Sequence, residues 1–165
     1  QSSEVNVVRV EKTKTWKDNW NDILRYKIFQ DETLKQLMLI PDGTEILHFV
    51  DKYFLENITG DEILTDEKVR VVYYDSDGGD SDNKDVKLRY KEFDIFVRED
   101  VLHNADPKDM LRNRYDMIAE RLRYLLTGET YLYGMRFSYR NAYNLWTKTI
   151  GYRRYHVVFT YYITV

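Results

Sequence analysis

The sequence predicts an α+β fold, in which an antiparallel sheet of two hairpins has one helix packed across it and a helical segment before it. Three patterns predict this fold. Residues 106–128 have the spacing of an amphipathic helix, strand-like sequence lies on both sides of them, and the segment 1–58 has helical spacing. The length of 165 residues suits one compact domain. We expect a single domain over 1–165, with a mainly helical part at 1–58 and a hairpin–helix–hairpin core at 66–165.

The chain begins with a short alternating segment and a helix. The segment 1–14 alternates weakly through four valines, which predicts an edge strand or an arm that reaches towards a neighbour. Thr15 suits the N-cap of a helix over residues 16–29, whose apolar residues share one face. That face consists of Trp16, Trp20, Ile23, Leu24 and Ile28.

Two shorter helices should complete the N-terminal part. Asp31 suits the N-cap of the first of them, and Pro41 stops regular structure after it. Its apolar residues are Leu34, Leu37 and Met38. Thr44 suits the N-cap of the other. The apolar stripe of that helix would consist of Leu47, Val50, Tyr53 and Phe54.

Two strand patterns predict the first hairpin. They are KVRVVYY at residues 68–74 and VKLRYKEFDIFV at residues 86–97, and the segment between them, DSDGGDSDNKD, has the composition of a loop. In the second strand the apolar alternation changes phase between Tyr90 and Phe93, which predicts a β-bulge near Lys91 and Glu92.

The helix over residues 106–128 has both a start and a stop signal. Asp106 suits its N-cap, Pro107 its first position and Gly128 its left-handed C-terminal cap. Its apolar stripe consists of Met110, Leu111, Tyr115, Ile118, Leu122, Leu125 and Leu126.

Strand-like sequence returns after this helix. Met135, Phe137 and Tyr139 alternate, and Tyr143 and Leu145 continue the alternation after a break. The last run, GYRRYHVVFTYYITV, is semi-apolar on both faces, which predicts a central strand or one that a partner covers.

Composition and charge limit the possible functions. The absence of cysteine excludes disulfides, zinc–thiolate sites and cysteine nucleophiles, and no apolar run is long enough to span a membrane. We expect no signal peptide and no membrane association. The isoelectric point near 5.7 argues against a general nucleic-acid binder. Ten of the fifteen tyrosines follow residue 105, which favours surfaces that are half buried or covered by a partner.

The charge is unevenly distributed. Residues 106–165 hold ten Lys and Arg against five Asp and Glu, a net charge of +5, whereas residues 1–105 carry a net charge of −8. Such a dipolar subunit could contact its copies head to tail, or it could have a solvated surface whose charges happen to segregate.

No motif predicts catalysis. Asp75 and Asp77 have the spacing of the first two calcium ligands of an EF-hand, but Asp80 replaces the required glycine and Val86 the bidentate glutamate. This segment could therefore hold a cation loosely, but we favour its interpretation as an acidic surface loop. His48, His103 and His156 lie in three different elements and are expected to be structural or superficial. We expect no enzymatic activity, no cofactor and no metal; a metal-dependent nuclease on the acidic loop is the least favoured alternative.

Arginines cluster with tyrosines in the C-terminal part. They lie on the long helix at Arg112, Arg114, Arg121 and Arg123 and near the last strands at Arg136, Arg140, Arg153 and Arg154. They could form a solvated face paired with Asp116 and Glu120, a surface for phosphates and bases, or a contact with the acidic residues 56–85 of a neighbouring subunit. The last suits the charge distribution best. The candidate subunit interface is Arg112, Arg121, Arg123, Arg136, Arg153, Arg154, Tyr152 and Tyr155.

Residues 66–165 resemble the bacteriophage tail-terminator or tail-completion family of neck proteins, which join head and tail. The features that carry the resemblance are the hairpin of strands 68–74 and 86–97, the single helix with RYDMIAERLRYLL, and the terminal GYRRYHVVFTYYITV. The resemblance implies a virion protein, assembled in the host cytoplasm, whose six-membered ring caps the tail tube and faces the head–tail connector. Its partners would be its own copies, the tail tube protein and the connector or head-closure protein.

The resemblance also implies that DNA passes through the ring without specific binding. The acidic residues Asp75, Asp77, Asp80, Asp82 and Asp85 would suit the lumen, where like charge keeps DNA from adhering, or would dock onto the tube. The N-terminal helical part departs from the family and could be an adaptor. The alternatives are another head–tail adaptor, head-closure or tail protein, and a nucleic-acid-binding host-takeover protein that uses the Arg and Tyr surface.

Overall fold

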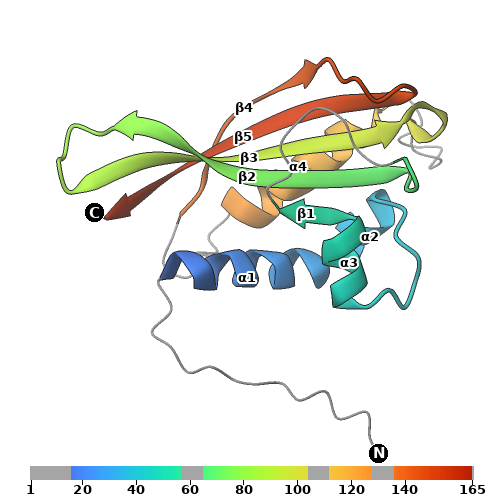
Figure 1. Ribbon diagram of the computed structural model, residues 1–165, viewed down its shortest axis with the longest axis horizontal. Helices are drawn as coiled ribbons and strands as arrows, with labels where there is room; N and C mark the ends of the chain where they lie inside the picture. The colour runs from blue at the N-terminus through green and yellow to red at the C-terminus, as the bar shows by residue number, and fades with distance from the viewer. Residues whose placement is uncertain (1–15, 57–64, 104–111, 128–135, 165) are drawn as a thin grey trace, which may run out of the picture.

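A computed structural model of the chain describes residues 16–56, 65–103, 112–127 and 136–164. In these residues the fold is mixed α+β with a five-stranded sheet, which confirms the predicted class (Figure 1). The helices are α1 (Trp16–Phe29), α2 (Glu32–Leu37), α3 (Ile46–Lys52), the 3-10 turn η1 (Glu99–Val101) and α4 (Arg114–Thr127). The strands are β1 (Phe54–Glu56), β2 (Val69–Asp80), β3 (Val86–Arg98), β4 (Ser138–Leu145) and β5 (Tyr152–Thr164).

The strand order in the sheet is β1-β2-β3-β5-β4. Every neighbouring pair is antiparallel except β1 and β2, which run parallel. The predicted sheet therefore lacks β1, a strand of three residues whose first residue, Phe54, is predicted to belong to the third helix. The last run of the chain, β5, lies between β3 and β4, which matches the first of its two predicted alternatives.

The main hydrophobic core of the described residues lies between the helices and one face of the sheet. Alternate residues of β3 and β5, including Phe93, Ile95 and Val157, pack there with Leu24 of α1 and Ile118 of α4. Aromatic rings continue the core across the strands, from Phe49 in α3 through Phe54, Tyr73 and Phe93 to Phe159. All four α-helices contribute to this core, and it fixes α4 across β3, β5 and β4.

The first two helices are close to the prediction, and the third is not. Helix α1 has the predicted bounds, and the Asp31 carboxylate accepts a hydrogen bond from Leu34 N at 2.9 Å, as an N-cap should. Helix α3 has Glu45 rather than Thr44 as its N-cap. The predicted stripe is wrong at Leu47, which is 73% exposed, and it omits the buried Phe49. Its other members are buried, as are Tyr53 and Phe54, or half buried, as is Val50. Pairing with β2 extends the chain from residue 54 and ends the helix there.

Strand β2 extends to Asp80, well into the segment predicted as a loop. Ladder pairing with β3 outweighs the low strand propensity of these acidic residues, and the loop is confined to residues 81–85. The bulge predicted at Lys91 and Glu92 is absent, because the register of β3 runs unbroken there. A register shift lies in β2 instead, between Asp77 and Asp80. Lys91 occupies a core-facing position, and its charge produced the apparent change of phase.

Helix α4 begins at Arg114, not near Asp106. Asn113 forms an isolated bridge with His103, and Arg114 N donates to Leu102 O at 2.6 Å, so Asn113 and Arg114 pair with the end of the segment that follows η1. The predicted stripe is confirmed at four positions, since Tyr115, Ile118, Leu122 and Leu126 are buried. Leu125 is half buried. No helix in the described parts of the chain is long and apolar enough to cross a membrane.

Several predictions lie outside the described residues. They concern the strand or arm at 1–14, the cap at Thr15, the helix start and first apolar residues at 106–111, the cap at Gly128 and the strand start at Met135. The side chains of Trp16 and Trp20 also lie outside them.

Candidate interaction pocket between α4 and β4

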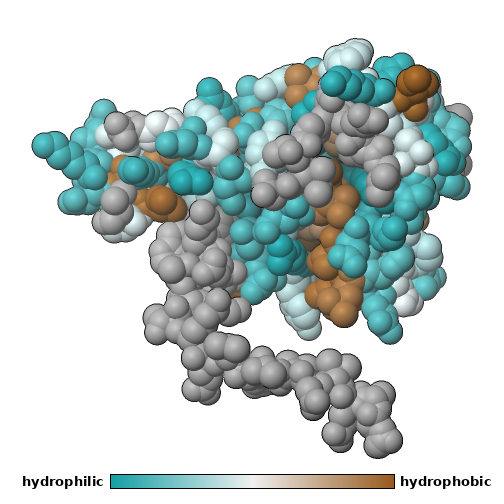
Figure 2. Space-filling view, in the orientation of Figure 1, coloured by the Kyte–Doolittle hydropathy of each residue, from teal (hydrophilic) through white to brown (hydrophobic). Residues whose placement is uncertain are grey.

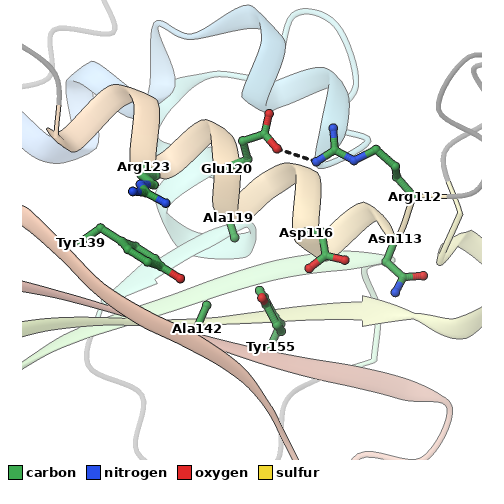
Figure 3. A pocket seen from close by; sticks show the side chains of 9 residues that line it. All are labelled: Arg112, Asn113, Asp116, Ala119, Glu120, Arg123, Tyr139, Ala142 and Tyr155. Carbon is green, nitrogen blue, oxygen red and sulfur yellow. Dashed lines mark hydrogen bonds and ion pairs between the residues drawn. The ribbon is translucent and has the colours of Figure 1, made fainter.

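A pocket of about 460 Å³ lies where α4 crosses the last strands of the sheet. Figure 3 shows side chains from α4 and from the strands converging on it. The lining residues are Arg112, Asn113, Asp116, Ala119, Glu120, Arg123, Tyr139, Ala142 and Tyr155. The pocket thus combines one helix with the edge strand β4 and its neighbour β5.

Two alanines create the hollow. Ala119 points from α4 towards the strands, and Ala142 points from β4 towards the helix (Figure 3). Because neither side chain extends beyond Cβ, the helix and the strand leave space between them that longer side chains would fill. Tyr139 and Tyr155 border this space from the sheet, and both pack partly on the hydrophobic core.

The rim of the pocket carries charges of both signs. Arg112 donates to Glu120 at 2.5 Å, although both side chains are exposed, at 44% and 66%. An ion pair this exposed contributes little to stability. The Arg123 guanidinium lies 4.2 Å from the centre of the Tyr139 ring, a cation–π contact. The pocket is therefore amphipathic, with an apolar floor and a polar rim.

Tyr155 contacts a second tyrosine and a carboxylate beside the pocket. Its ring lies 4.7 Å from the Tyr115 ring, and its hydroxyl is close to Asp116. Burial and the negative charge of Asp116 both raise the pKa of the Tyr155 hydroxyl. The phenol therefore stays protonated and can donate a hydrogen bond at physiological pH.

A second hollow of about 340 Å³ lies between α2 and α4 and shares Arg112 and Glu120 with the first. Arg121 lines it and donates two hydrogen bonds to Asp31, at 2.6 and 2.9 Å. Burial alone would raise the pKa of Asp31, but the hydrogen bonds from Arg121 and from Leu34 N lower it below its ordinary value. Arg121 thus holds the carboxylate that caps α2.

The structure brings together three of the eight predicted interface residues, because Arg112, Arg123 and Tyr155 line the same pocket. The others lie elsewhere. Arg121 binds Asp31, and Arg154 binds Asp94 through two hydrogen bonds of 3.0 Å. Of the remaining three, Arg136 and Arg153 are exposed, and Arg153 lies 3.6 Å from Glu99. Tyr152 is buried, and its hydroxyl donates a hydrogen bond to Glu67 O.

The predicted acidic loop divides into two parts. Asp75 lies in β2 and is half buried, where it accepts hydrogen bonds from Lys91 Nζ at 3.1 Å and from the Tyr161 hydroxyl at 2.7 Å. Asp77 is exposed and accepts from Gly79 N. Asp82 and Asp85 are exposed in the loop at the end where β2 and β3 project beyond the helices (Figure 1). Asp80 belongs to β2, and its side chain lies outside the described ones.

Sequence reasoning missed a charged cluster on the opposite face of the sheet. His156 Nδ1 lies 2.7 Å from Asp94 Oδ1, and its Nε2 lies 2.9 Å from Glu92 Oε1. Arg154 completes the cluster through Asp94. Burial would lower the pKa of His156, but the two carboxylates raise it above its ordinary value. The sequence does contain a sign of this cluster, because charged residues alternate in both strands. That alternation identifies a cluster only once the register between the two strands is known.

A scan against protein-family models and a search of curated proteins found no match to this chain. In the described residues, no group of three His, Asp or Glu side chains is placed to hold a metal ion.

Proposed function

We propose that this chain is a structural, non-enzymatic subunit of a bacteriophage neck. In this proposal its copies form a ring, six-membered by the family resemblance, that terminates the tail tube and joins it to the head connector around the DNA channel. One observation supports assembly most strongly. A strand edge that no other described strand covers, an amphipathic pocket and a turn with exposed apolar side chains all occur on β4 and the residues that follow it.

The exposed turn joins β4 to β5. Within it, Ile150 is 95% exposed and Trp146 is 73% exposed, although the side chain of each is large and apolar. Figure 2 shows an apolar surface at the end of the sheet that holds this turn. Tryptophan, tyrosine and arginine are enriched in protein interfaces, and apolar side chains gathered on a surface favour a binding partner.

The projecting end of β2 and β3 suits the second part of the proposal. It places Asp82 and Asp85, both exposed, farther from the helices than the rest of the sheet (Figure 1). In the ring, this end would either face the lumen, where its negative charge repels DNA, or dock onto the tail tube. The proposal treats β2–β3 and β4–β5 as the two hairpins of the family's core, with α4 across them.

Light scattering on the purified chain, alone and with tail tubes, tests this function. We expect a closed oligomer or assembly onto the tubes. Replacing Trp146 and Ile150 together with serine should reduce assembly, while the control Leu47→Ser, equally exposed on α3, should not. A strict monomer that ignores tubes at every concentration would contradict the proposal. Assembly onto connectors but not onto tubes would instead favour a head-closure adaptor.

One observation favours nucleic-acid binding as the second candidate. Arg123 lies over the Tyr139 ring and Arg140 lies 4.7 Å from the Tyr90 ring, and such pairs offer a cation next to an aromatic face. Retardation of DNA or RNA with a steep dependence on salt would support this function. No retardation at low salt would exclude it.

A further inference from the structure

Strand β4 has an open edge in the described part of the sheet. β4 is the last strand of the sheet, and among the described strands only β5 pairs with it. A register shift skips Arg140, so Asn141–Leu145 is the regular part of this edge. It contains no proline and no charged residue, the features with which proteins usually protect an edge. Its outward N–H and C=O groups can therefore accept another strand.

The pocket lies beside this edge. Tyr139 and Ala142 line it from β4, and Asp116, Ala119 and Glu120 line it from α4 (Figure 3). In a strand added to β4, alternate side chains would stand on the side of Ala142, which faces α4. These side chains would enter the pocket. The apolar floor suits small apolar side chains, and the charged rim suits polar ones next to them.

The sequence contains a segment of the required kind in residues 4–10, EVNVVRV. Valine has a high propensity for strands, and the segment 1–14 contains neither glycine nor proline. In an extended conformation Val5 and Val7 lie on one side and Val8 and Val10 on the other. Either side can thus offer two valines to the pocket. The segment ends in EKTKT, a charged stretch that suits a connection across solvent.

The length of this segment is sufficient. Fifteen residues precede α1 in the sequence and span up to about 50 Å when extended, while the eight residues of β4 span about 27 Å. The segment can therefore cover the edge and still cross a gap between subunits.

The position of α1 favours an edge on another subunit. Asn21 of α1 accepts from Lys91 of β3 and Arg25 donates to Tyr73 of β2, so α1 lies below the first part of the sheet. Helix α4 lies on the same face and packs against β3, β5 and β4. Helix α4 therefore lies between α1 and the β4 edge of the same chain, which favours an edge on a neighbouring copy.

We propose that the segment 1–14 of one subunit adds a strand to the β4 edge of the next subunit and places valine side chains in its α4–β4 pocket. This proposal rests on the proposed self-assembly and identifies the segment that makes the contact. The contact joins two different surfaces of the same chain, so repetition closes into a ring when the rotation between subunits allows it.

Cross-linking tests the proposal in the full chain, which has no cysteine of its own. A Val8→Cys chain is mixed with a differently tagged Asn144→Cys chain and treated with a short bismaleimide. We expect mixed dimers at about a hundredfold the yield obtained with a Leu47→Cys partner, since a bound arm holds the two thiols at millimolar effective concentration. Leu47 is exposed but lies on α3.

A pair of variants tests the pocket separately. Ala142→Trp should fill the pocket and abolish the mixed dimer. Tyr143→Trp, on the opposite face of the same strand, should leave it intact. Circular dichroism and the melting temperature must first show that both variants are folded.

Three results would overturn the proposal: a yield no higher than with the control, a mixed dimer that survives Ala142→Trp, or cross-linking only within a chain that carries both cysteines. Assembly in light scattering without cross-links between the segment 1–14 and the β4 edge would refute this contact but would not contradict the neck function. Cross-links in a chain that ignores tubes and connectors would support the contact and refute the neck function.

Discussion

Asp94→Asn should cost the folded chain a large part of its stability. Asp94 is buried, with its side chain 4% exposed, and it accepts two hydrogen bonds from Arg154 and one contact from His156. Asparagine keeps the shape but removes the charge that both cationic groups face. Removing one partner of a buried ion pair costs about 3–5 kcal/mol. In a domain of this size that loss lowers the melting temperature by about 6–20 °C.

The chain offers a matched control for this variant. Asp100 also binds an arginine through two hydrogen bonds, from Arg98 at 2.6 and 2.9 Å, but both side chains are exposed. Asp100→Asn should therefore melt close to the unchanged protein. Urea denaturation followed by circular dichroism measures both variants, with equal slopes confirming that they unfold alike. If Asp94→Asn and Asp100→Asn lose equally little, the buried cluster does not stabilise the sheet as the geometry implies.

Three further predictions concern His156, Ile118 and Arg121. The pKa of His156 is raised in the folded chain, so the stability that its charged form contributes is complete below about pH 6.5 and is lost as the pH rises through the folded pKa. The difference in unfolding free energy between the unchanged protein and His156→Gln, measured by urea titration, should therefore shrink towards alkaline pH. A difference that stays constant with pH would contradict this. Ile118→Asp should unfold the chain by circular dichroism, because it buries an unpaired charge where the side chain is 0% exposed. Arg121→Glu should lose about 1 kcal/mol in urea titrations by repelling the Asp31 cap. Arg153→Glu, which removes only an exposed pair at 3.6 Å from Glu99, should lose much less, and equal losses would contradict this assignment.

The sequence was sufficient where the determinants are local. The bounds of α1 follow from apolar spacing within one helix, and the start of α2 follows from a carboxylate three residues from the N–H that it caps. Strand β5 was recognisable because both of its faces carry apolar residues. In each case the pattern and the interaction that it reports lie within a few residues of each other.

The errors arise where a distant partner decides the structure. Ladder pairing extends β2 through acidic residues, and pairing with β2 makes a strand of residues assigned to a helix. The change of phase between Tyr90 and Phe93 predicts a bulge, but Lys91 occupies a core position, which its ion pair with Asp75 makes possible. The pocket needs Ala119 and Ala142 to face each other across two elements, and no local pattern contains that information.

The ion pairs within one subunit also change what the uneven distribution of charge along the chain implies. The excess of positive charge after residue 105 suggested contact with an acidic neighbour, but Arg121 reaches Asp31 and Arg154 reaches Asp94 within one subunit. These pairs join residues 90 and 60 positions apart in the sequence, so the basic and acidic halves partly neutralise each other on folding. Charge complementarity is therefore a weaker reason to expect a contact between subunits. A contact between copies would then rest mainly on main-chain hydrogen bonds at β4 and on apolar burial beside Ala142, which local sequence can specify without a large net charge.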